Sequence, residues 1–254
     1  MSDAIYPTLR DRAVLVTGGA MGIGAAIVEH FARQHARVAF IDIAADQAGA
    51  LAERLAGEGL PKPHFAKADI RDIASLREAI ASCAASVGEF HVLVNNAGHD
   101  ERHRWEDVTP DYWDGRIAVN LRHQFFAIQA VAPMMQRRRA GSIVNFGSIS
   151  WHIGQGGMPA YTSSKAAIEG LTRSFARDLG PDNIRVNCVL PGWIMTERQL
   201  ALWVTPETER EIERNQCLKQ KLYPPDVARL VLWLAADDSR MCTNQTWTVD
   251  GGWI

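Results

Sequence analysis

The sequence predicts an α/β fold in which a single doubly wound parallel sheet carries helices on both faces. Two observations carry this prediction. Short β-branched apolar segments alternate with helical segments along the whole chain, and the apolar segments are continuous rather than alternating. Continuous apolar strands are typical of parallel sheets, because helices bury both faces. No Pro/Gly/Ser-rich linker and no internal repeat interrupts the pattern, so residues 1–254 are predicted to form one domain.

Seven segments are predicted as strands from their apolar, β-branched composition. They are residues 13–17, 37–42, 64–68, 91–95, 142–147, 184–190 and 245–249. Helical periodicity predicts helices over residues 23–34, 44–55, 73–86, 160–179 and 225–236, with two more between 110 and 138. The segment 193–222 is long, charged and only partly helical, and it follows a strand on the ligand side of such sheets. We expect a mobile substrate lid there; the alternative is a surface excursion with a packing role.

The composition narrows the class of protein. The net charge of −2, without a long run of one sign, argues against a nucleic-acid or anionic-membrane partner. The four cysteines form no C-x-x-C pair, which argues against a metal knuckle and suits a reducing compartment. The first residues lack the pattern of a signal peptide, and no apolar run approaches a membrane span of about 18 residues. A cytoplasmic protein is predicted.

A glycine-rich turn, Thr17–Gly24, joins the first predicted strand to the first predicted helix. Glycines let the backbone turn tightly and approach a pyrophosphate, while the helix N-terminus offers free N–H groups and a positive dipole end. Strand, turn and helix in this order are the context that a dinucleotide site requires. Asn95-Asn96-Ala97-Gly98, after the fourth strand, lies at the same sheet edge, where small residues permit close approach of a nucleoside.

Asp42 closes the second predicted strand. A carboxylate there can accept hydrogen bonds from the adenosine ribose and would repel a 2′-phosphate, and Met21 supplies no compensating cation. NAD is therefore predicted over NADP. The alternative is that Asp42 is an ordinary turn carboxylate at a strand end.

Tyr161 and Lys165 lie one helical turn apart at the start of a predicted helix, so the phenol and the ammonium can address one site. A positive charge near the phenol favours phenolate. A Tyr161 pKa lowered from about 10 toward neutrality would make the side chain a general base. Taken alone, a Tyr-x-x-x-Lys spacing is common by chance, and a pair on the surface of a helix is the default interpretation.

The motifs together closely resemble the short-chain dehydrogenase/reductase family, from about residue 13 to the terminus. They occur in family order: Thr17–Gly24, Asp42, Asp69-Ile70, Asn95–Gly98, Asn120, Ser148, Tyr161 with Lys165, and Pro191-Gly192. The resemblance implies a Rossmann-type fold and a homotetramer. One departure is Gly147, where many members carry a second serine.

The resemblance also implies the roles of individual residues. Tyr161 would be the acid/base, Lys165 would lower its pKa and hold the cofactor ribose, and Ser148 would bond the reacting oxygen. Asn120 would anchor a water that relays protons. The expected cofactor contacts are Gly18, Met21, Gly22, Ile23, Gly24, Asp42, Ile43, Asp69, Ile70, Asn96, Ala97, Gly98, Tyr161, Lys165, Pro191, Gly192, Ile194 and Thr196.

Five local segments are less specific than these motifs: Ala4–Pro7, Asp100–His103, Asn120–His123, Gly147–His152 and Gln216–Lys219. Through them the chain looks most like the bacterial aldose 1-dehydrogenases of the D-xylose and L-arabinose type within the family. The expected substrate contacts are Asp100, Ser148, Ser150, Trp151, His152, Tyr161, Trp193 and Gln199. Polar groups can satisfy sugar hydroxyls, and a tryptophan face can pack against C–H groups. The predicted reaction oxidises the anomeric hydroxyl of a small aldose to the aldonolactone, with hydride transfer to NAD.

Three alternatives remain open. The substrate could be another polyol or a deoxy sugar acid, since such enzymes share the same catalytic residues. A catalytically silent dinucleotide-binding regulator is possible in principle, although the intact set of Asn120, Ser148, Tyr161 and Lys165 argues against it. His99, Asp100 and His103 could ligate a metal, but their spacing fits no strong zinc pattern, so no metal is predicted.

Overall fold

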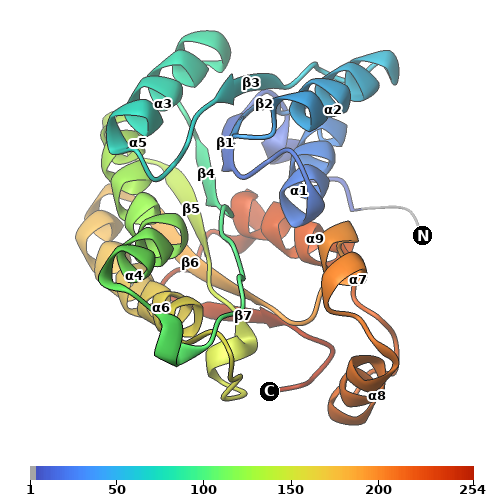
Figure 1. Ribbon diagram of the computed structural model, residues 1–254. Helices are drawn as coiled ribbons and strands as arrows, with labels where there is room; N and C mark the ends of the chain where they lie inside the picture. Colours follow the sequence, from blue (N-terminus) through green and yellow to red (C-terminus); the bar gives the residue numbers. More distant parts are fainter. Residues whose placement is uncertain (1–3) are drawn as a thin grey trace.

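Seven apolar strands form one sheet in the computed structural model, which describes residues 4–254 (Figure 1). Neighbouring strands are parallel throughout, in the order β3-β2-β1-β4-β5-β6-β7. The strands are β1 (Ala13–Thr17), β2 (Arg37–Asp42), β3 (His64–Lys67), β4 (Val92–Asn95), β5 (Gly141–Phe146), β6 (Ile184–Pro191) and β7 (Thr246–Val249). The predicted doubly wound parallel sheet is confirmed. Residues 1–3 of the predicted domain lie outside the described residues.

Helices cover both faces of the sheet (Figure 1). On one face, α1 (Gly22–Arg33), α2 (Ala45–Gly57) and α9 (Pro224–Ala235) pack their apolar sides against the strands. On the other, α3 (Ile73–Val87), α5 (His123–Arg138) and α6 (Pro159–Leu179) do the same. Helices α1, α2, α3, α6 and α9 begin and end within two residues of the predicted bounds. The two cores explain why β1 and β4 are buried along their whole length.

The two helices expected between residues 110 and 138 are α4 (Pro110–Ile117) and α5. A π-helical turn, Ala118–Arg122, joins them without a break in the chain direction. Wide turns of this kind are rare and occur often at functional sites. This one places Asn120, which is fully buried, inside the turn.

The segment 193–222, which interrupts the alternation of strands and helices, forms two short helices, α7 (Glu197–Leu202) and α8 (Pro206–Asn215). Each begins at a threonine whose hydroxyl accepts a backbone N–H, Thr196 for α7 and Thr205 for α8. In Figure 1 the segment lies at the lower right, with α8 at its outer end. Of the helices formed by residues 4–254, none combines the length and apolar character needed to cross a bilayer.

Candidate functional site

The carboxyl ends of the strands surround a cavity of about 970 Å³. The strand order reverses between β1 and β4, so Thr17 at the end of β1 pairs with Ile41 on one side and Asn95 on the other. The connections leaving β1, β2, β3, β4, β5 and β6 all contribute to the cavity wall. Ligands of open α/β sheets bind at such a reversal.

Every residue expected to contact a cofactor lines this cavity. From the glycine-rich turn to the segment after β6 they are Gly18, Met21, Gly22, Ile23, Gly24, Asp42, Ile43, Asp69, Ile70, Asn96, Ala97, Gly98, Tyr161, Lys165, Pro191, Gly192, Ile194 and Thr196. The structure therefore brings together residues from six segments of the chain. Their individual contacts with a cofactor stay predictions.

The glycine-rich turn is held against the end of β4. Gly18 has φ +67°, and a Cβ on it would lie 2.8 Å from Cα of Ala97, so only glycine fits. The side-chain amide of Asn96 donates to the carbonyls of Thr17 and Gly18 at 3.1 and 2.9 Å. Asn96 thus fixes the shape of the turn, a role that its sequence position alone does not reveal.

The N-terminus of α1 has the features of a phosphate site. Its N-cap residue, Met21, makes no side-chain cap, whereas Asp72 caps α3 with hydrogen bonds to two backbone amides. The first N–H groups of α1 are therefore free of a side-chain acceptor where the helix dipole is positive. Because Met21, Gly22, Ile23 and Gly24 also line the cavity, the turn fits the pyrophosphate of a dinucleotide.

Asp42 is both a turn residue and a wall of the cavity. Its Oδ2 accepts the N–H of Ala20 at 2.9 Å, and its Oδ1 accepts those of Ile43 and Ala44 at 2.8 and 3.0 Å. The alternative of a structural turn carboxylate thus describes part of its role. A carboxylate has about four lone-pair sites, so it can still accept a ribose hydroxyl.

Asp69 and Ile70 form the wall beyond Asp42. Asp69 is paired with Arg71 through a contact of 2.6 Å, and this guanidinium lowers the pKa of the carboxyl. Arg71 also lines the cavity. The adenine end of the candidate dinucleotide site is accordingly bounded by an aliphatic side chain and a neutralised charge pair.

Tyr161, Lys165 and Ser148 meet in the middle of the cavity. Tyr161 and Lys165 project from the first turns of α6, with the Lys165 Nζ 5.6 Å from the centre of the phenol ring. Lys165 is 3% exposed and donates from Nζ to the Phe146 carbonyl at 2.8 Å. Ser148 is close enough to Tyr161 for its hydroxyl to lower the pKa of the phenol. The predicted catalytic group is thus assembled by β5 and α6.

The electrostatics differ from the expectation that the pair by itself favours phenolate. Burial raises the pKa of Tyr161 above its usual range, and the Asp100 carboxylate raises it further, whereas Ser148 lowers it. Burial also lowers the pKa of Lys165 to about 8. The spacing of the two residues along the helix carries no information on desolvation, which disfavours both the Tyr161 phenolate and the Lys165 ammonium. In the protein without ligand, the phenol is therefore neutral at neutral pH.

Asn120 lies beneath this group rather than in the cavity wall. Its Oδ1 accepts the N–H of His99 at 2.7 Å, and its Nδ2 donates to the carbonyls of His99 and Arg116 at 3.2 and 3.1 Å. A Cβ on Gly98 would lie 3.1 Å from the Lys165 Nζ and 3.2 Å from the Asn120 Oδ1. Asn120 therefore fixes the chain after β4 next to Lys165.

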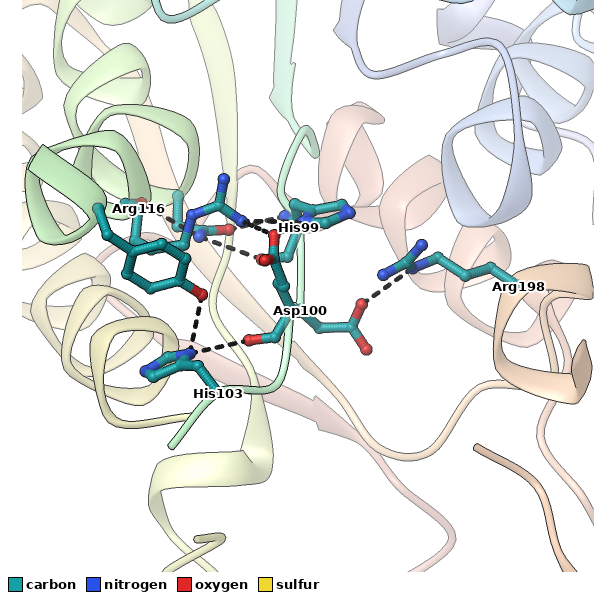
Figure 2. Close-up of polar contacts among 8 residues, drawn as sticks. His99, Asp100, His103, Arg116 and Arg198 are labelled. Carbon is teal, nitrogen blue, oxygen red and sulfur yellow. Dashed lines mark hydrogen bonds and ion pairs between the residues drawn. The ribbon is translucent and has the colours of Figure 1, made fainter. Parts of the chain in front are cut away.

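The other half of the cavity is formed by the loop after β4 and by the segment containing α7. Asp100 accepts hydrogen bonds from Nε of Arg198 at 3.2 Å and from Nε2 of Gln199 at 2.6 Å. Figure 2 shows Asp100 and Arg198 reaching toward one another from the two segments. The link joins parts of the chain that lie far apart in sequence, and it connects the expected lid to the loop.

Most of the expected substrate residues line this region: Asp100, Ser148, Ser150, Tyr161, Trp193 and Gln199. Trp151 and His152 do not line the cavity. Nε1 of Trp151 donates to Oε1 of Glu169 at 3.1 Å, and Nε2 of His152 contacts the same oxygen at 3.1 Å. The structure therefore does not bring these two side chains to the substrate region.

Several cavity residues escaped the analysis of the sequence: Arg102, Arg116, Gln155, Met158, Arg198 and Trp253. The arginines follow the same loop or lie on facing helices, so no short motif marks them. Arg116 donates from Nη1 to Glu101 at 2.8 Å and to Nδ1 of His99 at 3.0 Å (Figure 2). The number of charged residues near Asp100 is the sequence feature that could have indicated these arginines.

The two histidines of the candidate metal site, His99 and His103, have other partners. Nδ1 of His103 hydrogen-bonds the hydroxyl of Tyr112 at 3.0 Å, and His99 faces Arg116 (Figure 2). Burial, followed by the charges of Arg198 and Arg116, lowers the pKa of His99. Within residues 4–254 there is no cluster of three or more His, Cys, Asp or Glu side chains placed to hold a metal.

The fold and the site together define a dinucleotide-dependent oxidoreductase. A reversal in strand order, a glycine-rich turn at a helix N-terminus and a Tyr–Lys–Ser group share one cavity. A family model described as enoyl-(acyl carrier protein) reductase matches residues 18–254. The chain belongs to the short-chain dehydrogenase/reductase family, as predicted.

Two relatives match over nearly the whole chain. D-xylose 1-dehydrogenase of Caulobacter vibrioides is 51% identical over 253 residues, which cover 100% of both chains. The probable galactose dehydrogenase of Rhizobium meliloti is 52% identical over 247 residues, 97% of this chain and 96% of the relative. Both relatives are aldose dehydrogenases by name.

Solved structures agree with the fold. A 3-oxoacyl-[acyl-carrier protein] reductase from Brucella melitensis superposes with a TM-score of 0.91 at 33% identity, over 98% of this chain and 94% of that one. A structure of such a reductase from the same organism with bound NAD gives a TM-score of 0.89 at 33% identity and the same coverage.

Proposed function

We propose that this protein is an NAD-dependent aldose 1-dehydrogenase that oxidises the anomeric hydroxyl of a small aldose to the aldonolactone. The observation that carries the proposal is the continuity of the cavity, which runs from Asp42 past Tyr161 to Asp100. A dinucleotide and a small polar molecule can therefore meet at the phenol. The full-length similarity to a D-xylose and a galactose dehydrogenase supports the choice of aldoses.

In the proposed reaction the Tyr161 phenolate takes the proton of the anomeric hydroxyl while Ser148 donates a hydrogen bond to the same oxygen. NAD, when bound, would accept the hydride that leaves the anomeric carbon. The C–O bond thereby becomes the lactone carbonyl. Lys165, held by the Phe146 carbonyl, supplies a positive charge beside the phenol below its pKa of about 8. Asn120 holds the chain after β4 next to the Lys165 ammonium through its hydrogen bond with His99.

The raised pKa of Tyr161 indicates why ligand binding and base activation are linked. Burial keeps the phenol neutral in the free protein. A positive nicotinamide ring beside it would favour phenolate, as Lys165 does. We therefore propose that Tyr161 becomes an effective base only in the complex with oxidised cofactor. Asp42 supports NAD as that cofactor, since its charge would repel a 2′-phosphate.

The deciding experiment follows NADH or NADPH formation with a panel of pentoses, hexoses, polyols and sugar acids. We expect aldoses to be oxidised, with NAD preferred over NADP. Turnover of a sugar acid without turnover of any aldose would overturn the substrate assignment. No turnover by wild type with any compound would favour the dinucleotide-binding regulator instead.

A sugar acid is the second candidate substrate because of one observation. Arg102 lines the cavity and has no acidic partner among residues 4–254. A guanidinium without a carboxylate partner can bind the carboxylate of a ligand. The same panel, with matched neutral and acidic sugars, separates the two candidates.

Residues 193–222 are proposed as the substrate lid. The hydrogen bonds from Arg198 and Gln199 to Asp100 support a closed position of α7 over the cavity. Opening would break these two polar contacts and the packing of Arg102 against Trp193 and Trp203. Residues 1–254 are proposed to form one catalytic domain, with this lid inside it.

We further infer a homotetramer that works in the cytoplasm. Large apolar side chains on and next to α4 and α5 are exposed, among them Trp105, Trp113 and Phe125, which supports helix-to-helix contact between subunits. All four cysteines are free thiols, which suits a reducing compartment. Light scattering coupled to size exclusion tests the assembly; a monomer at micromolar concentration would contradict it.

A further inference from the structure

Three residues that line the cavity have a buried N–H without an acceptor: Arg102, Arg116 and Trp193. Nε of Arg102 and Nε1 of Trp193 are each shielded from solvent and make no hydrogen bond. Both residues line the cavity. Buried donors in folded proteins nearly always find a partner, in the protein, in water or in a ligand. Arg102 and Trp193 carry their donors on facing segments of the cavity, where an acceptor from outside the chain can enter.

Arg102 is held in place without using its donors. Its guanidinium carbon lies 4.3 Å from the centre of the Trp203 ring and 5.7 Å from that of Trp193. Contact with an aromatic face orients a guanidinium plane and leaves the N–H groups at its edge available. Arg102 follows Asp100 in the loop after β4, whereas both tryptophans flank α7.

The other arginines of the cavity are already paired. Arg71 contacts Asp69 at 2.6 Å, Arg116 contacts Glu101 at 2.8 Å and Arg198 contacts Asp100 at 3.2 Å. Among the arginines that line the cavity in residues 4–254, Arg102 alone lacks a carboxylate partner. Nε of Arg116 is also unbonded, but Glu101 pairs with the Arg116 charge, so the unpaired charge of its guanidinium distinguishes Arg102 from these three arginines.

We propose that Arg102 and Trp193 form a subsite that binds an oxygen atom of the substrate remote from the reacting hydroxyl, and that this contact sets substrate specificity. The inference rests on the proposed function, since it places a sugar in the cavity. Sites built to hydrogen-bond a substrate oxygen reject analogues that lack it, because the buried donors then stay unpaired. The acceptor is a hydroxyl of a neutral aldose or the carboxylate of a sugar acid.

The test compares two tryptophan variants that undergo the same chemical change. Trp193→Phe removes an N–H from a ring in the cavity wall. Trp203→Phe removes an equally buried and unbonded N–H from a ring outside that wall, and it keeps an aromatic face beneath Arg102. We expect Trp193→Phe to raise the KM for the aldose about fivefold with kcat nearly unchanged. Trp203→Phe should raise the KM clearly less than Trp193→Phe, because it alters the ring beneath Arg102 but removes no donor from the cavity wall.

Arg102→Met removes the charge and all donors while keeping the length of the side chain. We expect its KM to rise about 30-fold, since a charged donor contributes more than a neutral one. Single-deoxy aldoses then identify the contacted oxygen. For the deoxy sugar that lacks it, wild type and both cavity variants should show equal KM values. If the acceptor is a carboxylate, the uronic acid should instead show the largest loss.

Two failures are distinguishable. Absence of aldose and uronic-acid turnover by wild type would overturn the proposed function, and the subsite with it. Normal wild-type turnover combined with an unchanged KM in Trp193→Phe would overturn the subsite alone. Equal KM increases in Trp193→Phe and Trp203→Phe would likewise contradict it, because they would show a packing effect. NADH affinity, measured by fluorescence, should be unchanged in all three variants.

Discussion

The two halves of the cavity are built in different ways. Around Gly18 and the start of α1, the wall consists largely of backbone groups, held by side chains such as Asn96 that bond to the turn itself. Around Asp100 and Arg102, the wall consists of side chains that reach across from segments distant in sequence. The shape of the first half is set by the backbone, whereas the second half can change by substitution of single residues.

The two halves of the cavity differ in how they recognise a ligand. Backbone amides at a helix N-terminus bind any pyrophosphate, so that half serves many enzymes of one family. Side chains such as Asp100 and Trp193, in contrast, are proposed to select the substrate. Tyr161 and Lys165 lie between the halves, and Asp100 acts on the pKa of both. The substrate half therefore influences the chemistry as well as the binding.

Tyr161→Phe is expected to give the largest effect. Loss of the general base should lower kcat by a factor of about 10³, in line with the usual contribution of a positioned acid or base. The nucleotide half does not need the hydroxyl for its shape, so the affinity for NADH should stay within about twofold of wild type. Stopped-time assays of NADH formation and a fluorescence titration measure the two quantities. Residual activity near wild type would show that Tyr161 is not the base.

Asp42→Ala tests the nucleotide half. We expect the ratio of kcat/KM for NAD to that for NADP to fall about 30-fold, because a charged acceptor is lost together with its repulsion of a 2′-phosphate. The variant should also unfold at a lower temperature, since three backbone N–H groups lose their acceptor. Asp69→Ala is the matched control; it should weaken both cofactors alike. An unchanged ratio in Asp42→Ala would remove Asp42 as the discriminating residue.

The features that could be predicted from the sequence are those that depend on residues close together in the chain. The turn Thr17–Gly24 and the pair Tyr161/Lys165 are short-range patterns, and the structure places all of their predicted site residues in the cavity wall. Strands and helices were predictable because burial imposes a period on neighbouring residues. Each such feature depends on residues close together in the chain.

The features that sequence reasoning missed depend on long-range contacts or on burial. Nothing near Arg102 in the sequence predicts its stacking on Trp203, because the two meet only after folding. Gly147 is a second case: a Cβ there would lie 2.4 Å from Cδ2 of Leu190, so a serine at this position requires the Leu190 side chain to move. The raised pKa of Tyr161 is a third, since desolvation depends on the folded surroundings.

Asp100→Asn measures how strongly the substrate half acts on the chemistry. The Asp100 carboxylate raises the pKa of Tyr161, so removal of its charge should lower that pKa. Oxidation requires the phenolate, and activity therefore rises as pH rises through the Tyr161 pKa. The rising limb of kcat/KM for the aldose, at saturating NAD, should move to lower pH in the variant. A limb that stays in place or moves to higher pH would show that Asp100 is screened from Tyr161.

Trp151→Phe is expected to have the smallest effect, and it tests the boundary of the substrate half. The indole N–H of Trp151 bonds Glu169 on α6 at 3.1 Å, outside the cavity wall. Its loss should lower the free energy of unfolding by about 0.5–1 kcal/mol, as for one partly exposed hydrogen bond. The KM for the aldose should change by less than about twofold, in contrast with Trp193→Phe. A KM increase as large as in Trp193→Phe, with unfolding unaffected, would place Trp151 against the substrate and extend the substrate half beyond α6.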